Sequence, residues 1–160
     1  KDNYSIIYYG AKNHPECKAI LEDHLDIYLI ESINDIYKLN INNDKIFFAS
    51  QTTASYNDCL VIEDLLKKKY PNIEMIKDIC NATKMRQLAL IEKSKSCDFI
   101  LVIGDKKSNN TNQLVNIAKT YTKASLIENI SDLKNIDLNA INYEKSLFSL
   151  KKLGMRQLNS

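Results

Sequence analysis

The sequence predicts an α/β fold in which two similar small lobes each contain a mostly parallel sheet flanked by helices. Short runs rich in β-branched and aromatic residues alternate with segments of helical periodicity along most of the chain. Several of the strand-like runs are apolar on both faces, as is typical of parallel strands covered by helices on both sides. Part of the pattern also occurs twice, which indicates two related lobes.

The first half of the chain contains three predicted strands and three predicted helices. The expected strands are residues 5–9, 27–30 and 46–49, and the expected helices are residues 14–22, 32–37 and 55–70. The last helix has the strongest support, because Ser55 can cap its N-terminus and Pro71 follows its end. Apolar residues recur along one face of this helix at the spacing of an amphipathic helix.

The second half shows the same alternation. An apolar, strand-like run from Ile73 to Ile79 leads into a helix expected at residues 83–95. The strand at residues 99–103 is the clearest in the chain, because five apolar residues are followed directly by Gly104. The remaining expected elements are a helix at 111–119, a strand at 124–127, a short helix opening at 131–133, and an amphipathic, helix-like tail over residues 143–153.

One short pattern occurs in both halves. Leu29-Ile30-Glu31-x-Ile33-x-Asp35 matches Leu126-Ile127-Glu128-x-Ile130-x-Asp132, and both copies begin in the last two residues of a predicted strand. The repeat predicts a lobe over residues 1–77 and a second lobe over residues 78–160. In sheets of this kind ligands bind at the loops that follow the carboxyl ends of the strands.

Composition excludes several classes of function. The 160 residues are 44% hydrophobic and 26% charged, which suits one ordinary domain or two small lobes. A net charge of +2 gives no indication of binding to nucleic acid or to a membrane surface. No run approaches the roughly 18 apolar residues that a membrane span requires. The chain begins with Lys1, without a signal-peptide pattern, so we expect it to begin inside a longer protein.

The four cysteines, at positions 17, 59, 80 and 97, show no CxxC spacing. This spacing argues against a self-contained zinc site, and the composition is unlike that of a disulfide-stapled secreted domain. A reducing compartment is therefore expected.

Cys80 is the most informative of these cysteines. It lies where the strand-like run gives way to a helix, and a helix N-terminus favours the thiolate form of a cysteine. A thiolate in an α/β crevice is either a metal ligand or a nucleophile. The neighbouring residues alone leave both roles open.

Three other polar loops also follow predicted strands. In the first, His14 and Glu16 flank Pro15, so that a donor to anions and a group able to give or take a proton are close together. The second contains Thr52 among other hydroxyl residues, and the third contains Ser108, Asn109 and Asn110. The first two loops can also serve only to cap the helix that follows them, and the third can be an ordinary polar loop. All four polar clusters nevertheless follow strands, as a single binding crevice would require.

Four collinear motifs resemble the LytB-type reductases of isoprenoid synthesis, the 4-hydroxy-3-methylbut-2-enyl diphosphate reductases. In chain order the motifs are His14-Pro15-Glu16, Gln51-Thr52-Thr53-Ala54-Ser55, Asp78-Ile79-Cys80-Asn81-Ala82-Thr83-x-x-Arg86-Gln87, and Gly104-x-Lys106-x-Ser108-x-Asn110-Thr111-Asn112. The motifs and their spacing agree over residues 5–133.

The resemblance implies a fold of three similar α/β lobes around a central cavity. It also implies an iron–sulfur cluster of the [4Fe-4S] type, held by one cysteine from each lobe. The implied reaction is reductive removal of the substrate hydroxyl, which gives isopentenyl and dimethylallyl diphosphates in the last step of the methylerythritol phosphate route. The implied partners are the allylic diphosphate and an electron donor such as ferredoxin or flavodoxin, with no nucleic acid and no membrane. The implied location is plastid stroma or bacterial cytoplasm.

The resemblance also assigns roles to individual residues. Cys80 would be one metal ligand, with the other cysteine ligands outside this chain. Glu16 would be the proton source, supported by Thr52 close to the substrate hydroxyl. The residues implied in substrate binding are His14, Thr52, Ser108, Asn109 and Asn110, of which Asn109 stands where the family usually has a second serine.

The chain departs from the family pattern at both ends. The family's first lobe and its C-terminal Gly-Ala-Ser-x-Pro loop are both missing. We therefore expect a portion of a reductase that is inactive in isolation. One alternative is a non-catalytic α/β module that binds a diphosphate or a partner and has lost its redox centre. Another is an enzyme that uses Cys80 as a nucleophile together with His14.

Overall fold

The computed structural model describes residues 4–23, 26–76, 79–137 and 146–150. The chain divides into two compact units, residues 1–84 (unit 1) and residues 85–160 (unit 2). The predicted boundary between the lobes, at Lys77 and Asp78, lies outside the described residues.

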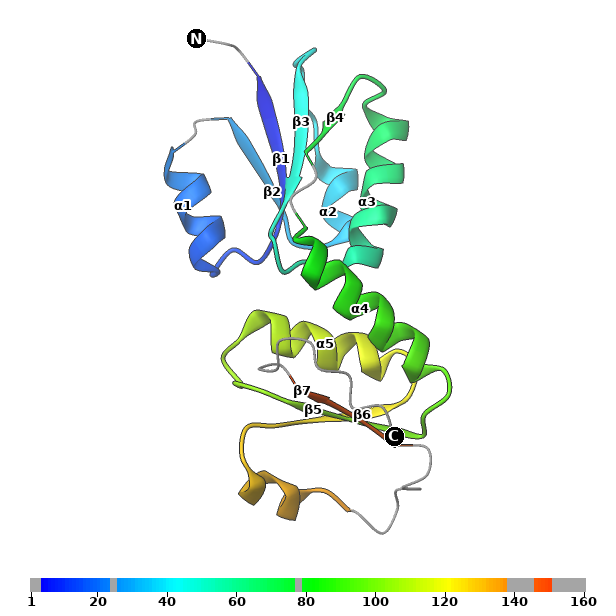
Figure 1. Ribbon diagram of the computed structural model, residues 1–160. Helices are drawn as coiled ribbons and strands as arrows, with labels where there is room; N and C mark the ends of the chain where they lie inside the picture. Colours follow the sequence, from blue (N-terminus) through cyan, green and yellow to red (C-terminus); the bar gives the residue numbers. More distant parts are fainter. Residues whose placement is uncertain (1–3, 24–25, 77–78, 138–145, 151–160) are drawn as a thin grey trace. The chain divides into compact units, whose positions relative to one another are not determined.

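Unit 1 contains a four-stranded parallel sheet with the strand order β2-β1-β3-β4. Its elements are β1 (Ser5–Tyr9), α1 (Pro15–Asp23), β2 (Ile27–Ile30), α2 (Ile33–Lys38), β3 (Ile46–Ser50), α3 (Tyr56–Lys69) and β4 (Glu74–Met75). Helix α1 covers one face of the sheet, while α2 and α3 cover the other (Figure 1).

Alternation along the central strands supplies both faces of this sheet. Ile7 and Phe48 point toward α2 and α3 and join a buried cluster with Ile36, Ile62 and Leu66. Tyr8 and Ala49 point the other way and pack with Cys17 of α1. Because successive strand residues face opposite sides, an apolar pair such as Ile7-Tyr8 is buried on both faces, as the sequence predicts.

Unit 2 contains a three-stranded parallel sheet with the order β6-β5-β7. Helix α4 (Asn81–Ser94) runs from unit 1 into unit 2. It is followed by β5 (Phe99–Ile103), α5 (Asn109–Lys119), β6 (Lys123–Ile127), the 3-10 helix η1 (Ile130–Asn135) and β7 (Ser146–Leu150). The strongly amphipathic α5 buries Leu114, Val115 and Ala118 against Ile100 and Val102 of β5.

The two units repeat the same strand–helix geometry. The orders β2-β1-β3 and β6-β5-β7 correspond, and each central strand ends at a glycine. The Gly10 N–H donates to the Ile30 carbonyl at 3.1 Å, and the Gly104 N–H donates to the Ile127 carbonyl at 2.9 Å. The repeated pattern found in the sequence therefore corresponds to a repeated structure.

The predicted α/β class, with parallel sheets flanked by helices, is confirmed. The strands expected at residues 5–9, 27–30 and 99–103 have those bounds in the structure, and Ser55 caps α3 by accepting from the Asp58 N–H at 3.3 Å. Several predicted helices differ by one or two residues at their ends, where helices fray and caps compete with the helical conformation.

The prediction of a helix-like tail over residues 143–153 is wrong where the structure describes it. Residues 146–150 form β7, which pairs in parallel with β5. Helical periodicity in a short segment is a weak signal, and an open edge of β5 offers the backbone a complete ladder of hydrogen bonds. Pairing with a strand far away in the sequence therefore determines the conformation of this segment.

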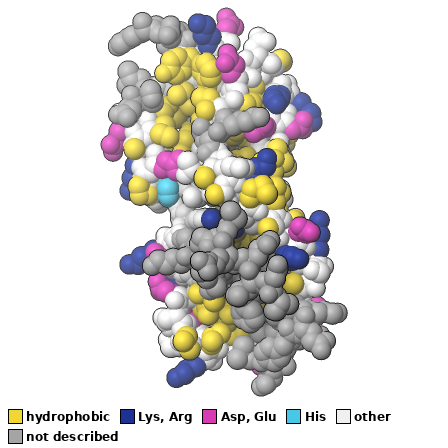
Figure 2. Space-filling view, viewed as in Figure 1, with side chains coloured by type: hydrophobic (Ala, Val, Ile, Leu, Met, Phe, Trp, Pro, Cys, Tyr) yellow, Lys and Arg dark blue, Asp and Glu magenta, His cyan; other side chains and the backbone are white. Residues whose placement is uncertain are grey.

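The described surface carries mixed charge. On the face shown in Figure 2, acidic and basic side chains are interspersed, in keeping with a net charge of +2. Within the ranges described, no helix has the length and apolar character needed to cross a bilayer.

Candidate functional site

The loop after β1 brings His14 and Glu16 to the start of α1. Pro15 occupies the first helical position, where its missing N–H costs nothing, and the His14 carbonyl accepts from the Lys18 N–H at 3.0 Å. His14 Nδ1 accepts from the Glu16 N–H at 3.3 Å and lies 3.9 Å from Glu16 Oε2. With Nδ1 used as an acceptor, the neutral imidazole carries its proton on Nε2 and can donate from that atom.

Thr52 holds the carboxylate of Glu16 through two hydrogen bonds. The Thr52 N–H donates to Oε1 at 3.1 Å, and its hydroxyl donates to Oε2 at 3.1 Å. The two residues follow β1 and β3, which are neighbouring parallel strands, so their loops meet at the same edge of the sheet. The structure thus brings together three of the predicted site residues: His14, Glu16 and Thr52.

Cys80 is exposed and lies directly before α4. Its carbonyl accepts from the Lys84 N–H at 3.0 Å, which is the first hydrogen bond of that helix. Cys80 is therefore at the N-cap position, where the N-terminus of α4 favours a negative charge. The preceding strand, β4, is only two residues long.

The other cysteines lie in different surroundings. Cys17 and Cys59 are buried, and burial raises the pKa of the Cys17 thiol and raises that of Cys59 to about 11. A raised pKa opposes the thiolate form that metal ligation needs. Cys97 is half-buried in unit 2.

A complete set of ligands for an iron–sulfur cluster is not present among the described residues. No group of three or more His, Cys, Asp or Glu side chains that could hold a metal occurs there. Of the four cysteines, Cys80 alone is exposed. The residues at hand thus supply one thiol suited to such a cluster and do not by themselves fit the whole group.

In unit 2, the loop after β5 leads into the N-terminus of α5. Ser108 occupies the N-cap position and its hydroxyl makes no capping bond, while its carbonyl accepts from the Asn112 N–H at 3.0 Å. The Asn112 side chain donates to the Lys106 carbonyl at 2.8 Å and closes the loop. Asn109 is exposed and Asn110 is half-buried, both in the first turn of the helix.

Two polar atoms near this helix start are buried without a partner among the described residues. They are Asn110 Oδ1 and the hydroxyl oxygen of Thr111. Buried polar atoms are normally paired, because leaving one unpaired costs about 1–3 kcal/mol. This helix start, with an uncommitted Ser108 hydroxyl and free helix N–H groups, is suited to an anionic ligand.

The repeat places these loop residues in equivalent positions. His14 and Ser108 each precede a helix that follows a central strand ending in glycine, and Glu16 and Asn110 each follow two residues later. The same scaffold thus presents an acid in unit 1 and neutral hydrogen-bonding groups in unit 2.

Sequence reasoning missed a cavity of about 330 Å³ in unit 1. It lies between β3, α3 and the start of α4, next to Ile79 and Asn81 on either side of Cys80. At its edge the Lys84 ammonium lies 4.6 Å from the centre of the Tyr56 ring, a cation–π contact. The residues come from three separate segments, so no local pattern could have revealed this cavity.

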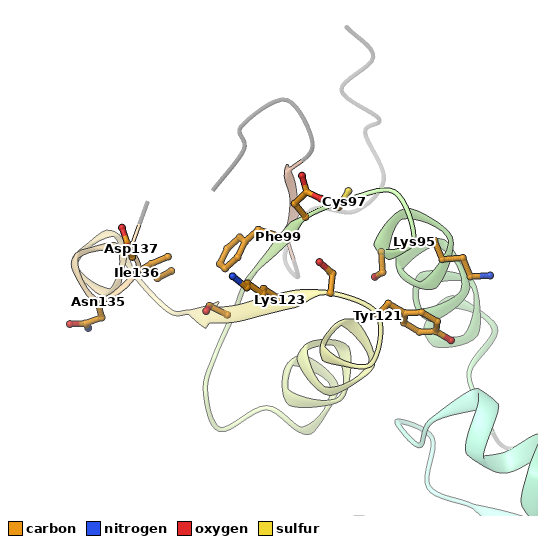
Figure 3. A pocket seen from close by; sticks show the side chains of 12 residues that line it. Lys95, Cys97, Phe99, Tyr121, Lys123, Asn135, Ile136 and Asp137 are labelled. Carbon is orange, nitrogen blue, oxygen red and sulfur yellow. The ribbon is translucent and has the colours of Figure 1, made fainter. Parts of the chain in front are cut away.

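A larger open cavity of about 890 Å³ lies in unit 2, and it contains none of the predicted site residues. Figure 3 shows it near Cys97, Phe99 and Lys123, at the amino ends of β5 and β6. Ligands of parallel α/β sheets bind at the carboxyl ends of the strands, so this cavity is a weaker candidate than the loops after β1, β3 and β5.

Comparison with known proteins gives a consistent result. The family model described as "LytB protein" matches residues 1–148. The chain belongs to the LytB family. It is 41% identical over 147 residues to the 4-hydroxy-3-methylbut-2-enyl diphosphate reductase of Geobacillus sp. strain WCH70 and 42% identical over 137 residues to that of Malacoplasma penetrans.

Among solved structures, the LytB-family reductase of Plasmodium falciparum, described as an E-1-hydroxy-2-methyl-but-2-enyl-4-diphosphate reductase, is similar with a TM-score of 0.84 and 36% identity. The match covers 92% of this chain and 48% of that one. The match to the Geobacillus reductase likewise covers 91% of this chain and 46% of the relative. The chain therefore spans about half the length of the family members that it matches.

Proposed function

We propose that this chain is part of an iron–sulfur reductase that acts on 4-hydroxy-3-methylbut-2-enyl diphosphate. In this reaction the bond from carbon to the hydroxyl oxygen breaks and a carbon–hydrogen bond forms. Two electrons and two protons enter, and the oxygen leaves as water. The products are isopentenyl and dimethylallyl diphosphates. The electrons come from a donor protein such as ferredoxin or flavodoxin.

The observation that carries this proposal is the pairing of Glu16 with Thr52. Two hydrogen bonds from Thr52, both 3.1 Å long, hold the Glu16 carboxyl group in one orientation at the carboxyl edge of a parallel sheet, and a carboxyl group oriented in this way can transfer a proton to a bound substrate. Glu16 protonates the departing hydroxyl, and Thr52 fixes the direction of the carboxyl group. Thr52 is itself exposed, so its hydroxyl can also reach the substrate.

Substrate binding is proposed for the neutral donors of the two helix starts. His14 donates from Nε2 to a phosphate oxygen, and Ser108, Asn109 and Asn110 bind phosphate oxygens at the N-terminus of α5. The uncommitted Ser108 hydroxyl and the position of the three residues at a helix start support this role.

Cys80 is proposed as one ligand of a [4Fe-4S] cluster whose other cysteine ligands lie outside this chain. Its exposure and its position before α4 support the assignment. The expected compartment is plastid stroma or bacterial cytoplasm, which is consistent with the bacterial and Plasmodium sources of the relatives.

The test uses a chimera in which residues 1–137 replace the matching segment of the Geobacillus reductase, so that the family's remaining lobes are present. Cys80→Ser should abolish the cluster's visible absorbance, whereas Glu16→Gln should leave the absorbance unchanged and reduce turnover by at least about 100-fold. Cys97→Ser is the matched control for Cys80→Ser and should change neither the absorbance of the cluster nor the turnover. An active Glu16→Gln chimera would refute the proton-donor role.

A second candidate is a non-catalytic module that binds a diphosphate. The presence of a single exposed cysteine among the four favours it. Binding of inorganic diphosphate to this chain, together with absence of turnover in the wild-type chimera, would support the module over the reductase.

A further inference from the structure

The loop that carries His14 and Glu16 is held at three successive backbone N–H groups. Gly10 donates to the Ile30 carbonyl at 3.1 Å, and Lys12 donates to Glu31 Oε1 at 2.8 Å. Between them, Ala11 donates to Gln51 Oε1 at 3.2 Å. The acceptors Ile30 and Glu31 lie at the end of β2, whereas Gln51 follows β3. Of these three acceptors, Gln51 is therefore the one that links this loop to the loop of Thr52.

The side chain of Gln51 is fixed at both ends. It is only 5% exposed, and its Nε2 donates to the Thr53 hydroxyl at 2.7 Å. Its backbone N–H donates to the Tyr9 carbonyl at 2.8 Å. Because both polar ends of the buried amide are paired, this side chain has one strongly preferred orientation.

Gly10 shows how closely the loop and Gln51 pack. A Cβ atom at Gly10 would lie 3.1 Å from Gln51 Oε1 and 3.2 Å from Gln51 Cβ. It would also lie 3.0 Å from Cε1 of the Tyr8 ring. Only glycine permits this approach without displacing the neighbouring atoms.

We propose that Gln51 is a positioning residue that holds Glu16 against Thr52. Thr52 is the next residue in the chain, and Glu16 follows the loop segment that Gln51 binds at Ala11. The amide of Gln51 thus fixes the distance between the two segments that are joined by the 3.1 Å bonds from the Thr52 N–H and hydroxyl to the Glu16 carboxylate. The catalytic part of this inference rests on the proposed function, while the structural part does not.

The structural part is tested by amide hydrogen exchange on the 160-residue chain. Gln51→Met keeps the volume and removes both hydrogen bonds. The N–H groups of Ala11 and Thr52 should then exchange at least about 5-fold faster, while those of Ile7 and Phe48 in the strands change less than about 2-fold. Gln51→Glu retains an acceptor for Ala11 and lets the Thr53 hydroxyl donate, so it should restore at least half of the protection at Ala11 and Thr52.

The matched control is Gln113→Met, which changes a half-buried glutamine of α5 in unit 2. It should leave the exchange rates of the Ala11 and Thr52 N–H groups unchanged. An unchanged exchange rate of the Thr52 N–H in Gln51→Met would overturn the proposal. Equal acceleration of exchange at the loop and strand N–H groups would also overturn it, since that indicates general loss of structure.

The catalytic part is tested in the chimera. Gln51→Met should lower kcat about 10-fold and change KM less than about 2-fold, because a misplaced proton donor affects the reacting step. A change in KM alone would assign Gln51 to substrate binding and refute the positioning role. If the wild-type chimera fails to turn over, the proposed function fails, and the hydrogen-exchange result still decides whether Gln51 positions Glu16.

Discussion

At the scale of single residues, the clearest feature is that two loops are joined through side chains and not only through the sheet. Glu16 and Thr52 are 36 positions apart in the sequence, and each of their bonds is 3.1 Å long. A local motif such as His14-Pro15-Glu16 shows which chemical groups are present, but it does not show which acceptor or donor a distant loop will supply.

Thr52→Val distinguishes the contributions of the two hydrogen bonds to Glu16, because it removes the hydroxyl and keeps the backbone N–H. We expect turnover in the chimera to fall about 10-fold, since the carboxyl group loses one of its two anchors. The free energy of unfolding should change by no more than about 1 kcal/mol, because an exposed hydrogen bond contributes little. Steady-state kinetics and urea unfolding measure the two effects.

Thr122→Val, in unit 2, is the control for the threonine substitution and should leave turnover unchanged. A Thr52→Val chimera with wild-type turnover would remove Thr52 from the proton-delivery site.

At the scale of elements, the repeated pattern produces the same turn after β2 and after β6. Asp35 accepts from the Glu31 N–H at 3.2 Å, and Asp132 accepts from the Glu128 N–H at 2.8 Å. Each carboxylate also pairs with a lysine at 2.9 Å, Lys38 in one turn and Lys106 in the other. The acid in this pattern was visible in the sequence, and its physical purpose is to satisfy the N–H groups that leave the strand.

The turn should make stability depend on pH. The hydrogen bond from Lys38 is the main cause that holds the pKa of the Asp35 carboxyl well below its usual range, followed by that from Ser32. A depressed pKa in the folded state stabilises the fold above the unfolded pKa of about 3.9, and this contribution is lost as pH falls through the range below it.

Asp35→Asn should therefore lower the melting temperature at pH 7, and the difference from wild type should shrink as the pH falls below about 4. Thermal unfolding followed by circular dichroism between pH 2 and pH 7 measures this. Asp44→Asn removes a carboxylate from the same unit without touching the turn. A pH-independent difference between wild type and Asp35→Asn would contradict the role of the charge.

At the scale of the whole molecule, the chain divides into two compact units, and the residues that the structure describes do not form a complete redox site. It spans about half the length of its relatives, and the described residues contain no group of three metal-ligating side chains. We expect the chain alone, after anaerobic incubation with iron and sulfide, to form no stable cluster and to show no turnover. A stable cluster spectrum together with turnover by this chain alone would contradict this expectation.

The sequence by itself determined the α/β class, the main strands and the repeat. Continuous apolar runs such as Phe99–Ile103 carry this information locally, because burial on both faces requires apolar residues at every position. The sequence also identified His14, Glu16, Thr52, Cys80 and Ser108 as candidates, since each follows a strand.

Only the tertiary structure decided which of these groups meet. In the folded chain Thr52 donates hydrogen bonds to Glu16, and Gln51 links their two loops. The tail with a helix-like sequence pattern forms β7, which pairs with β5. These outcomes depend on contacts between segments that are far apart in the chain. Local propensity is weak compared with the hydrogen bonds and burial that such contacts provide, so no local pattern could have specified them.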